Sequence, residues 1–317
     1  MVTVEVEAAL RGLGVSAAAS TVLKDEQFGN SSWFVESADR GRMVLRRYHD
    51  RATAADIAYE HAVLLHLAST GWAVPAPIGE PVELHGRIYC LNRFVPGKPA
   101  TATSLEAQTR RGRDLARLHI DLRGLAERLG QRPGWQAQHR AVAVRLVISW
   151  DRCLSAFADV DRHLAEWAAR AAEDSQAALA DLDAQGLPEI VVHGDFAEWN
   201  VHYGTDGVLA GVIDFGLTHV DSRPYELAIA RTYRAPTMAD AYRAELYALS
   251  WPLDELEEAC VQPIYSAFRV DMVAWLLDHG FRTSGYDLKA IERHLARTAT
   301  PAPWLPRSYH RTQLPAT

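Results

Sequence analysis

The pattern of apolar and polar positions changes about a third of the way along the chain. In the first part, short runs rich in β-branched and aromatic residues alternate with turn residues, which is typical of antiparallel strands. The pattern predicts three strands within 20–48, with a hairpin turn at Asp39–Gly41, and a further strand over 87–95. Apolar residues recur at helical spacing over 2–13 and 53–70, so both ranges are predicted to be helices.

Further along, the pattern becomes mostly helical, with apolar positions three and four residues apart. Short predicted strands interrupt it at 190–192, 201–203 and 208–213. The predicted helices cover 105–129, 141–157, 160–182, 224–234, 239–248, 253–277 and 288–296, and a proline-rich tail from Thr300 is expected to lie extended over the surface. Strand runs followed by helix runs predict an α+β fold in two lobes, residues 1–95 and residues 96–317.

The composition is that of an ordinary globular protein. The 317 residues are 48% hydrophobic and 23% charged, enough to form a core without disulfides or structural metals. The net charge of -7 argues against a nucleic-acid partner, which would need a basic face. The three cysteines are scattered without metal-binding spacing, so we expect free thiols. No basic leader and no run of about 20 apolar residues is present, so we expect no membrane association and a cytoplasmic protein, monomeric or homodimeric.

Candidate chemistry lies at the ends of two short apolar runs. The first run leads through His193 to Asp195, and Asn200 follows; the second, over 211–213, leads to Asp214. Two acids and an amide are the groups needed to orient a hydroxyl nucleophile and to hold Mg²⁺ against nucleotide phosphates. We therefore expect Asp195 to accept the proton of the nucleophile, and Asn200 and Asp214 to bind the metal. His193 is expected beneath the loop as a structural hydrogen-bonding residue rather than a base.

These two motifs resemble those of a known family. His193–Asp195 with Asn200, followed by Ile213–Gly216, is similar to the aminoglycoside phosphotransferase / choline kinase family. Protein kinases usually have arginine where Gly194 stands, so the resemblance is to the branch that acts on small molecules. It covers roughly residues 20–280 and implies a bilobal protein-kinase-like fold, with an antiparallel sheet and one main helix in a small N-lobe and a large, mostly helical C-lobe. It also implies an enzyme that uses Mg²⁺ and ATP or GTP to phosphorylate a small molecule.

The resemblance implies a basic residue on an inward-facing strand position of the N-lobe. The matching position is Arg46, where the family has lysine, with Glu60 on the following helix as its partner. Strand alternation places Val44 and Arg46 on one face, and Leu45 and Arg47 on the other. Val44 would then cover the adenine, while Arg46 would reach the α- and β-phosphates with its planar set of donors. A solvated strand residue and an exposed helix acid are the alternatives for Arg46 and Glu60.

Two further segments are expected to contact the nucleotide. Gly29, Ser31 and Ser32 lie where the family has a phosphate-covering loop, although the segment lacks a GxGxxG pattern. A plain hairpin turn is the alternative there. The segment around Asn92 and Phe94 resembles the hinge between the lobes, whose backbone groups would bind adenine.

The helical C-lobe is expected to bind the acceptor. Glu226 lies in a segment that resembles the family's D-P-x-x-D-L-A motif, and we expect it to brace this lobe. Acidic residues of the lobe would suit a cationic or polyhydroxyl acceptor, with a solvated helix face as the alternative; they are Glu257, Glu258, Asp271 and Asp278.

The expected function is ATP- or GTP-dependent phosphorylation of a hydroxyl on a small molecule, such as an aminoglycoside-type antibiotic. A choline-like or homoserine-like amino alcohol is the alternative acceptor, and the sequence does not select between them. A nucleotide-binding scaffold without activity is supported by Arg46 and the missing glycine pattern, and opposed by the presence of Asp195, Asn200 and Asp214. A protein kinase is disfavoured by Gly194 and by the lack of an Ala-Pro-Glu element after Asp214.

Overall fold

The chain forms two compact units. The computed structural model describes residues 4–16, 19–24, 30–99, 104–137, 149–183, 185–229 and 236–298. The first unit comprises Met1–Ala100 with Trp199–Thr218, and the second comprises Thr101–Glu198 with His219–Thr317. The chain therefore leaves the second unit after Glu198 and returns to it at His219.

The first unit is built on a five-stranded antiparallel sheet. Its strands lie in the order β1-β2-β3-β5-β4 and are β1 (Ala19–Lys24), β2 (Ser31–Ser37), β3 (Gly41–Arg47), β4 (Val82–Leu84) and β5 (Arg87–Arg93). The strands predicted within 20–48 and over 87–95 are confirmed. β4 was not predicted, because its three residues are too few to show an alternating pattern. It is joined to β5 by His85 and Gly86, whose φ angles of 51° and 71° suit a two-residue hairpin turn.

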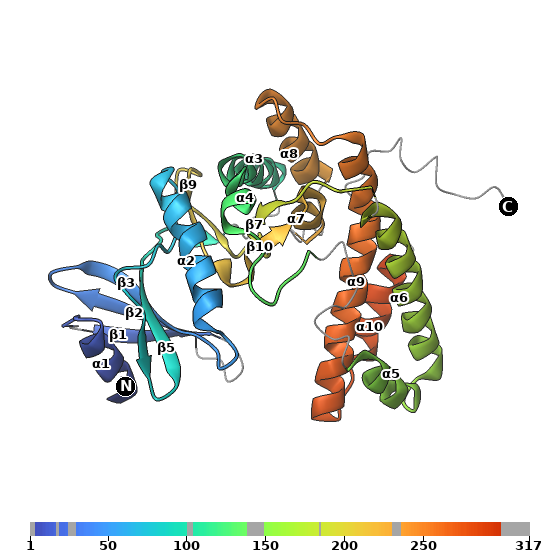
Figure 1. Ribbon diagram of the computed structural model, residues 1–317, viewed down its shortest axis with the longest axis horizontal. Coiled ribbons are helices and arrows are strands. Elements are labelled where there is room, and N and C mark those ends of the chain that lie inside the picture. The colour runs from blue at the N-terminus through green and yellow to red at the C-terminus, as the bar shows by residue number, and fades with distance from the viewer. Residues whose placement is uncertain are drawn as a thin grey trace. The chain divides into compact units, whose positions relative to one another are not determined.

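A helix packs on each face of this sheet (Figure 1). Helix α1 (Val4–Gly12) buries one apolar stripe, including Leu10, against Leu45 on β3. Helix α2 (Ala54–Ser69) covers the other face, where Ile57 packs with Tyr48 and Cys90. α2 begins at a capping box, in which Thr53 and Asp56 satisfy each other's backbone N–H groups.

A second, three-stranded sheet belongs to the first unit. It contains β6 (Lys98–Pro99), β8 (Val201–Tyr203) and β9 (Leu209–Val212), in the order β6-β8-β9. The Val212 N–H donates to the Ala73 carbonyl at 3.0 Å, which ties β9 to the loop after α2. A Cβ on Gly211 would lie 2.2 Å from the same oxygen, so this approach requires glycine. The Ile213 N–H donates to the Asn200 carbonyl at 2.9 Å and holds the two ends of the β8–β9 hairpin together.

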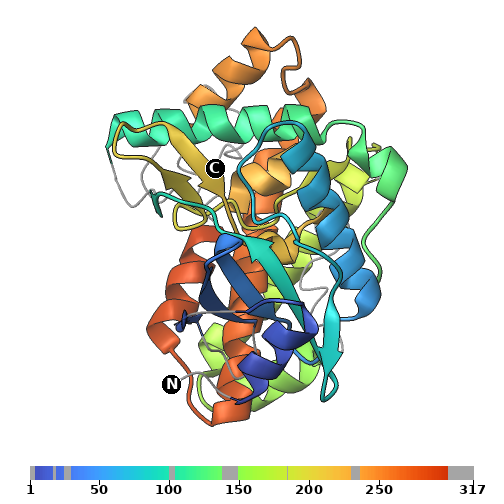
Figure 2. The ribbon, with the colours of Figure 1, turned by 90° about the vertical axis from the view of Figure 1, so that its left-hand side faces the viewer.

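The second unit is mostly helical, as predicted. Its helices are α3 (Leu105–Leu122), α4 (Leu125–Leu129), α5 (Trp150–Ala158), α6 (Arg162–Asp183), α7 (Arg223–Ile229), α8 (Pro236–Ala248), α9 (Glu255–Thr283) and α10 (Leu288–Thr298). Two short strands, β7 (Ile190–Val192) and β10 (His219–Asp221), pair antiparallel. Helix α3 lies against α8 (Figure 2), and α9 packs along α6, α7 and α10.

Two predicted helices end elsewhere than expected. The range 105–129 holds two helices rather than one, because Gly124 adopts a left-handed conformation with φ 74° between α3 and α4. α9 continues to Thr283, beyond the predicted end at 277. Parts of the predicted helices 141–157 and 224–234, and the tail from Thr300, lie outside the described residues.

The helices and the cysteines bear on the class of protein. Across the described ranges, no helix is both long enough and apolar enough to cross a bilayer. Cys90, Cys153 and Cys260 are all buried free thiols, as expected. Burial, with smaller effects from nearby carboxylates, raises the pKa of Cys90 and of Cys260 to about 12, so both stay protonated at neutral pH.

Candidate active site

One face of the five-stranded sheet carries several of the predicted nucleotide-binding residues. The register pairs Ser32 with Arg46, and Arg46 with Cys90, in one row across β2, β3 and β5. In the next such row on the same face, Val44 pairs with Asn92. The predicted placement of Val44 and Arg46 on one face is thus observed.

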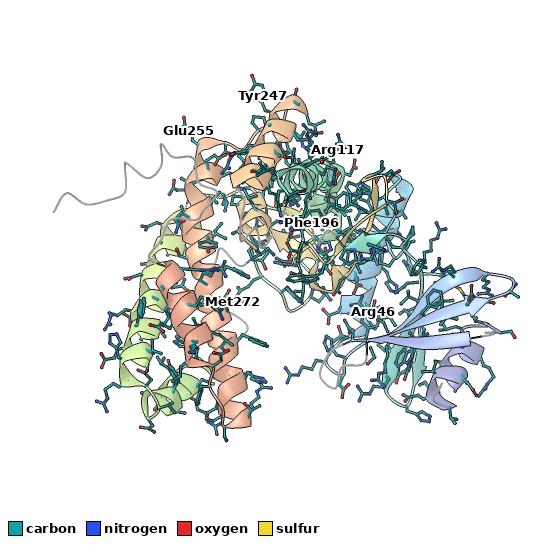
Figure 3. All side chains as sticks on the ribbon, turned by 180° about the vertical axis from the view of Figure 1, so that it is seen from behind. Arg46, Arg117, Phe196, Tyr247, Glu255 and Met272 are labelled. Carbon is teal, nitrogen blue, oxygen red and sulfur yellow. The ribbon has the colours of Figure 1, made fainter. Side chains whose placement is uncertain are left out.

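Arg46 is buried on this face and forms an ion pair with α2 (Figure 3). Its Nη1 donates to Glu60 Oε1 at 2.8 Å, and the two residues are only 7% and 1% exposed. Burial alone lowers the pKa of the Arg46 guanidinium. The Glu60 carboxylate, with smaller effects from Tyr48 and Asp214, outweighs burial, so the pKa lies above its usual value. Arg46 is therefore a permanent cation at the place where the resemblance implied one.

The same guanidinium also reaches the predicted metal-binding acid. Arg46 Nη2 lies 3.6 Å from Asp214 Oδ1, and the Asp214 side chain is 47% exposed. Asp214 adopts a left-handed conformation, φ 64° and ψ 60°, which is uncommon for a residue with a side chain and is often found at functional sites. Arg46 thus lies between two carboxylates, one buried and one open to solvent.

A glycine and an asparagine allow this close approach. A Cβ on Gly216 would lie 2.8 Å from Arg46 Nη2 and 3.5 Å from Asp214 Oδ1. The Asn30 side-chain amide reaches the same point, and its Oδ1 accepts from the His49 N–H at 3.0 Å. The role of the Asn30 side chain was not predicted. In a turn, no sequence pattern distinguishes a polar side chain that makes such contacts from one that is only hydrated.

Asn200 and Asp214 come from the two ends of the β8–β9 hairpin. Asn200 is 3% exposed, and its carbonyl accepts from the residue before Asp214. An amide oxygen and an exposed carboxylate suit Mg²⁺, which binds few protein ligands and takes its remaining ones from phosphates and water. The residues present therefore fit a magnesium ion bound together with a nucleotide.

The predicted phosphate-covering residues divide between the two faces of the sheet. Ser32 is partly buried beside Arg46. Ser31 is fully buried on the opposite face, where its hydroxyl accepts from Arg47 Nη2 at 2.8 Å. Gly29 lies outside the described residues. Of this segment, Ser32 shares the face of Arg46 and Ser31 does not.

The predicted hinge residues combine an apolar cluster with a buried amide. Phe94 packs edge to face on Phe34, with ring centroids 5.5 Å apart, and the Arg42 guanidinium lies 4.4 Å from the Phe94 centroid. Asn92 is 3% exposed, and its Oδ1 has no hydrogen-bond partner among the described residues. The backbone N–H of Arg93 is already engaged by the Ala76 carbonyl at 2.9 Å. The Asn92 side chain thus offers an unused polar group on the face of Val44.

In the second unit, Asp195 follows β7 on a loop that α7 holds from behind. The buried carboxylate of Glu226 accepts from the N–H groups of His193, Gly194 and Phe196, the last two at 3.1 Å and 3.3 Å. Burial alone would raise the pKa of Glu226. The His119 ring, whose Nε2 lies 3.8 Å away, together with His193 and the loop N–H groups, lowers the pKa of Glu226 by more than burial raises it, so Glu226 is ionised. The brace expected of Glu226 is present and is applied directly to the Asp195 loop.

Further contacts hold the loop on either side of Asp195. His193 is fully buried, and its Nδ1 accepts from the Asp195 N–H at 3.1 Å, as expected of a structural residue. Gly194 has φ 84°, a conformation that favours glycine over the arginine of protein kinases. The Phe196 ring, labelled in Figure 3, lies edge to face on His193 with centroids 5.9 Å apart. Asp195 is half-buried between Gly194 and Phe196, which are both buried.

A buried arginine that sequence reasoning missed also contacts this loop. Arg111 on α3 is 1% exposed and lies 3.5 Å from Glu198, three residues after Asp195. In the sequence it is one of several arginines on an amphipathic helix, and its helical position alone predicts a solvated side chain.

The acids that were expected to attract a cationic acceptor are largely occupied. Glu257 is buried in an ion pair with Arg223. Glu258 pairs with Arg243 at 2.6 Å. Asp278 pairs with Arg282 at 2.8 Å. The first two pairs join α9 to α7 and α8, and the third lies within α9. The three acids therefore give little support to a strongly cationic acceptor.

Comparison with known proteins identifies the relatives of this chain. The profile of the phosphotransferase enzyme family matches residues 24–258. The homoserine kinase of Xanthobacter autotrophicus is 30% identical over 233 residues, which are 71% of this chain and 67% of the relative. The homoserine kinase of Phenylobacterium zucineum is 32% identical over 210 residues, 63% of this chain and 59% of the relative.

Solved structures share the fold. A thermostable mutant of the aminoglycoside phosphotransferase APH(4)-Ia, in a ternary complex with ADP and hygromycin B, has a TM-score of 0.66 at 18% identity and covers 95% of this chain and 100% of its own. The amicoumacin kinase hAmiN, in complex with AMP-PNP and Ca²⁺, has a TM-score of 0.64 at 14% identity, covering 92% and 91%. The predicted protein-kinase-like α+β fold is confirmed. The chain belongs to the phosphotransferase enzyme family and is a small-molecule kinase.

Proposed function

We propose that the chain transfers the γ-phosphoryl group of ATP to a hydroxyl of a small, homoserine-like amino alcohol. The observation that carries the proposal is the row of charges Glu60, Arg46 and Asp214, with separations of 2.8 Å and 3.6 Å. It joins a permanent cation to an exposed carboxylate, an arrangement that suits nucleotide phosphates and a divalent cation. GTP is the alternative donor.

Arg46 steadies the α- and β-phosphates in this proposal. Its ion pair with Glu60 holds the guanidinium in place before the nucleotide binds, so little side-chain entropy is lost on binding. Val44 and Asn92, on the same face of the sheet, contact the base. Ser32 lies in the same row as Arg46, and its backbone and hydroxyl approach the phosphates.

Asn200 and Asp214 would hold Mg²⁺ against those phosphates. When bound, the ion neutralises charge on the phosphoryl group during transfer. Asp214 keeps an oxygen for this purpose because its contact with Arg46 is long, 3.6 Å, and involves only Oδ1.

Asp195 orients the hydroxyl of the acceptor and takes its proton. The hydroxyl oxygen attacks phosphorus while the bond to the β-phosphate oxygen breaks, and the proton passes to Asp195 late, because the transition state is loose. The braces from Glu226 and His193 hold the backbone of the Asp195 loop, which positions the residue for this role.

The choice of acceptor rests on two observations. The relatives that are 30% and 32% identical carry the name homoserine kinase. In addition, Glu257, Glu258 and Asp278 are paired with arginines, which disfavours a polycationic ligand at these positions. An aminoglycoside remains the second candidate, because proteins of this fold have been solved with hygromycin B.

The test is ATP consumption with Mg²⁺ in the presence of L-homoserine, choline, hygromycin B or no acceptor. Turnover is expected with L-homoserine and is expected to disappear in Asp195→Asn. Asp174→Asn, which changes an exposed acid on α6, is the matched control. Full turnover in Asp195→Asn would refute the mechanism. Turnover with hygromycin B alone would replace the acceptor, and tight Mg·ATP binding without turnover on any acceptor would favour a scaffold.

A further inference from the structure

A cavity of about 560 Å³ lies in the first unit, on the side of the sheet that α2 covers, with Ile88 two residues along β5 from Cys90, the strand partner of Arg46. Helix α2 forms one wall, and the segment from residue 77 through β4 to the start of β5 forms the other; Figure 2 shows the helix and these strands side by side. The volume is typical of sites for small molecules. The lining residues are Ala54, Ile57, Ala58, His61, Ala62, Leu65, Pro77, Gly79, Glu80, Pro81, Val82, Glu83 and Ile88.

The cavity exists because α2 presents small side chains there. Ala54, Ala58 and Ala62 are spaced by four residues and therefore lie on one side of the helix. Larger apolar side chains surround the space that they leave. Leu65 on α2 remains 53% exposed beside it, and Ile88 closes it from β5. A compact hydrocarbon group could fill this space and remove these side chains from water.

The polar groups of the cavity are acidic. Glu80 and Glu83 are exposed, and neither forms an ion pair with a residue that the structure describes. Among the described residues that line the cavity, none is a lysine or an arginine. Burial, the largest effect, lowers the pKa of His61, so this ring is neutral at pH 7. Two negative charges beside an apolar wall suit a ligand that combines a hydrocarbon body with an ammonium group.

The cavity is connected to the nucleotide-binding face through a short series of contacts. His61 Nε2 lies 3.4 Å from the Tyr48 hydroxyl. The Tyr48 ring lies 4.9 Å from the Arg46 guanidinium carbon. Arg46 in turn contacts Glu60, the neighbour of His61 on α2, and Asp214. Any displacement of α2 at the cavity would thus change the surroundings of Arg46.

We propose that this cavity is a regulatory site for a compact apolar amine, whose ammonium group lies near Glu80 and Glu83. The ligand binds the arrangement in which α2 leaves the cavity open and Glu60 is paired with Arg46. It therefore favours that arrangement and strengthens nucleotide binding, and by linkage the nucleotide strengthens binding of the amine to the same degree. The consequence for nucleotide binding rests on the function proposed above; the binding site itself does not.

Binding is tested with cyclohexylamine as the probe, by calorimetry on the full chain without nucleotide. Cyclohexylamine is expected to bind, and cyclohexanol to bind more weakly. Ala62→Leu, which places a larger side chain against the wall formed by α2, is expected to weaken binding about tenfold, because it takes part of the space for the ring. Glu80→Gln is expected to weaken it about two- to fivefold, the range for a partly exposed ion pair.

The matched controls make the same types of substitution at positions outside the cavity. Ala55→Leu lies on the exposed side of α2, and Glu36→Gln changes an exposed acid on β2. Both are expected to bind cyclohexylamine as the wild type does, and thermal unfolding checks that all variants fold. Unchanged binding in Ala62→Leu, or equal binding of cyclohexanol, would overturn the site.

Coupling is tested by measuring the Kd for Mg·ADP with and without saturating cyclohexylamine. An increase in affinity of about fivefold or more is expected, which is typical of linked sites. Tyr48→Phe removes the hydroxyl that contacts His61, so this variant is expected to bind the amine but to lose most of the coupling. Amine binding that leaves the affinity for Mg·ADP unchanged would overturn the regulatory role. Failure to bind Mg·ADP at all would instead count against the proposed function, since no acceptor or turnover enters either measurement.

Discussion

At the scale of single residues, Arg46 combines burial with two charged partners. Its guanidinium lies between the buried Glu60 and the exposed Asp214. A lysine ammonium is a compact charge, whereas the planar guanidinium can direct separate N–H groups at two partners. Nη1 serves Glu60 and Nη2 faces Asp214, so an arginine can perform both roles here.

Substitution of Arg46 is expected to separate its contribution to stability from its contribution to activity. Arg46→Met leaves the buried Glu60 carboxylate without its cation and should lower the free energy of unfolding by about 3–5 kcal/mol. Arg46→Lys keeps a charge but loses one of the two contacts, so kcat/KM for ATP should fall roughly tenfold to a hundredfold. Urea unfolding and steady-state kinetics measure the two effects. The control is Arg170→Lys on the exposed side of α6, and a fully stable Arg46→Met would contradict the role assigned to the ion pair.

Gly216 is expected to be sensitive to a single added carbon. The Cβ of Gly216→Ala would lie 2.8 Å from Arg46 Nη2, so the guanidinium must move away from Asp214. We expect a loss of about tenfold in kcat/KM for ATP, with a destabilisation of about 1–3 kcal/mol from overpacking. Gly285→Ala is the matched control, because a Cβ there meets no atom within 4 Å. Wild-type kinetics in Gly216→Ala would show that the contact with Asp214 is dispensable.

At the scale of elements, the Asp195 loop is held by the helix that follows β10 in the chain. α7 provides Glu226, and β7 provides the strand from which the loop starts. A carboxylate can accept all three N–H groups of the loop, since each of its oxygens has two lone pairs.

Glu226→Gln is expected to loosen this loop. The amide retains one acceptor oxygen but turns an NH₂ group toward backbone donors, which leaves at least one buried N–H unsatisfied. The free energy of unfolding should fall by about 1–3 kcal/mol. The decrease in kcat should be larger than the increase in KM for ATP. The loop holds Asp195, whereas the residues proposed to bind the nucleotide lie on the five-stranded sheet. Glu292→Gln, an exposed change on α10, is the control; an unchanged kcat would contradict the bracing role.

The elements also show where sequence patterns are informative. Long amphipathic ranges such as 160–182 and the apolar run before Asp195 predicted their helix and strand well. The short strands β4, β6 and β10 were missed, because none of them is an apolar run like that of β7, and they form strands only through their partners. The break at Gly124 was missed because the apolar spacing continues across it, while its positive φ is set by the packing of α3 and α4.

At the scale of the whole molecule, stability is expected to depend on pH through buried histidines. Burial lowers the pKa of His119 below its usual value of 6.5, although the nearby Glu226 acts to raise it. The folded protein keeps His119 neutral at pH values where the unfolded chain already binds a proton. The free energy of unfolding should therefore fall as the pH decreases below about 6.5, down to the folded pKa. Glu226, whose pKa is lowered, adds a further loss at more acidic pH.

The urea midpoint measures this effect. It should be lower at about pH 5.5 than at about pH 7.5, and His119→Gln should reduce the difference because the titrating group is gone. His163→Gln, on the exposed side of α6, should not reduce it. A midpoint that is the same at both pH values would contradict the assignment of a neutral, buried His119.

The boundary between the two units depends on contacts between residues that are distant in the sequence. The predicted boundary lies where strand-like patterns are replaced by helical ones, and it separates residues 1–95 from 96–317. Spatial contacts instead join Trp199–Thr218 to the first unit. The hydrogen bond from Val212 to Ala73 is one reason, since it links residues that are far apart in the sequence.

The amino-acid sequence alone was enough to indicate the chemistry and the family. Residue type and spacing were enough to select Asp195, Asn200 and Asp214 as candidates. Local periodicity predicts most helices and strands, because it depends only on neighbouring residues. Contacts between distant residues required the folded chain: Arg46 between Glu60 and Asp214, Ser31 turned away from Ser32, and Glu226 beneath the Asp195 loop. Such contacts depend on strand register and on the close packing of helices, and neither leaves a local signature in the sequence.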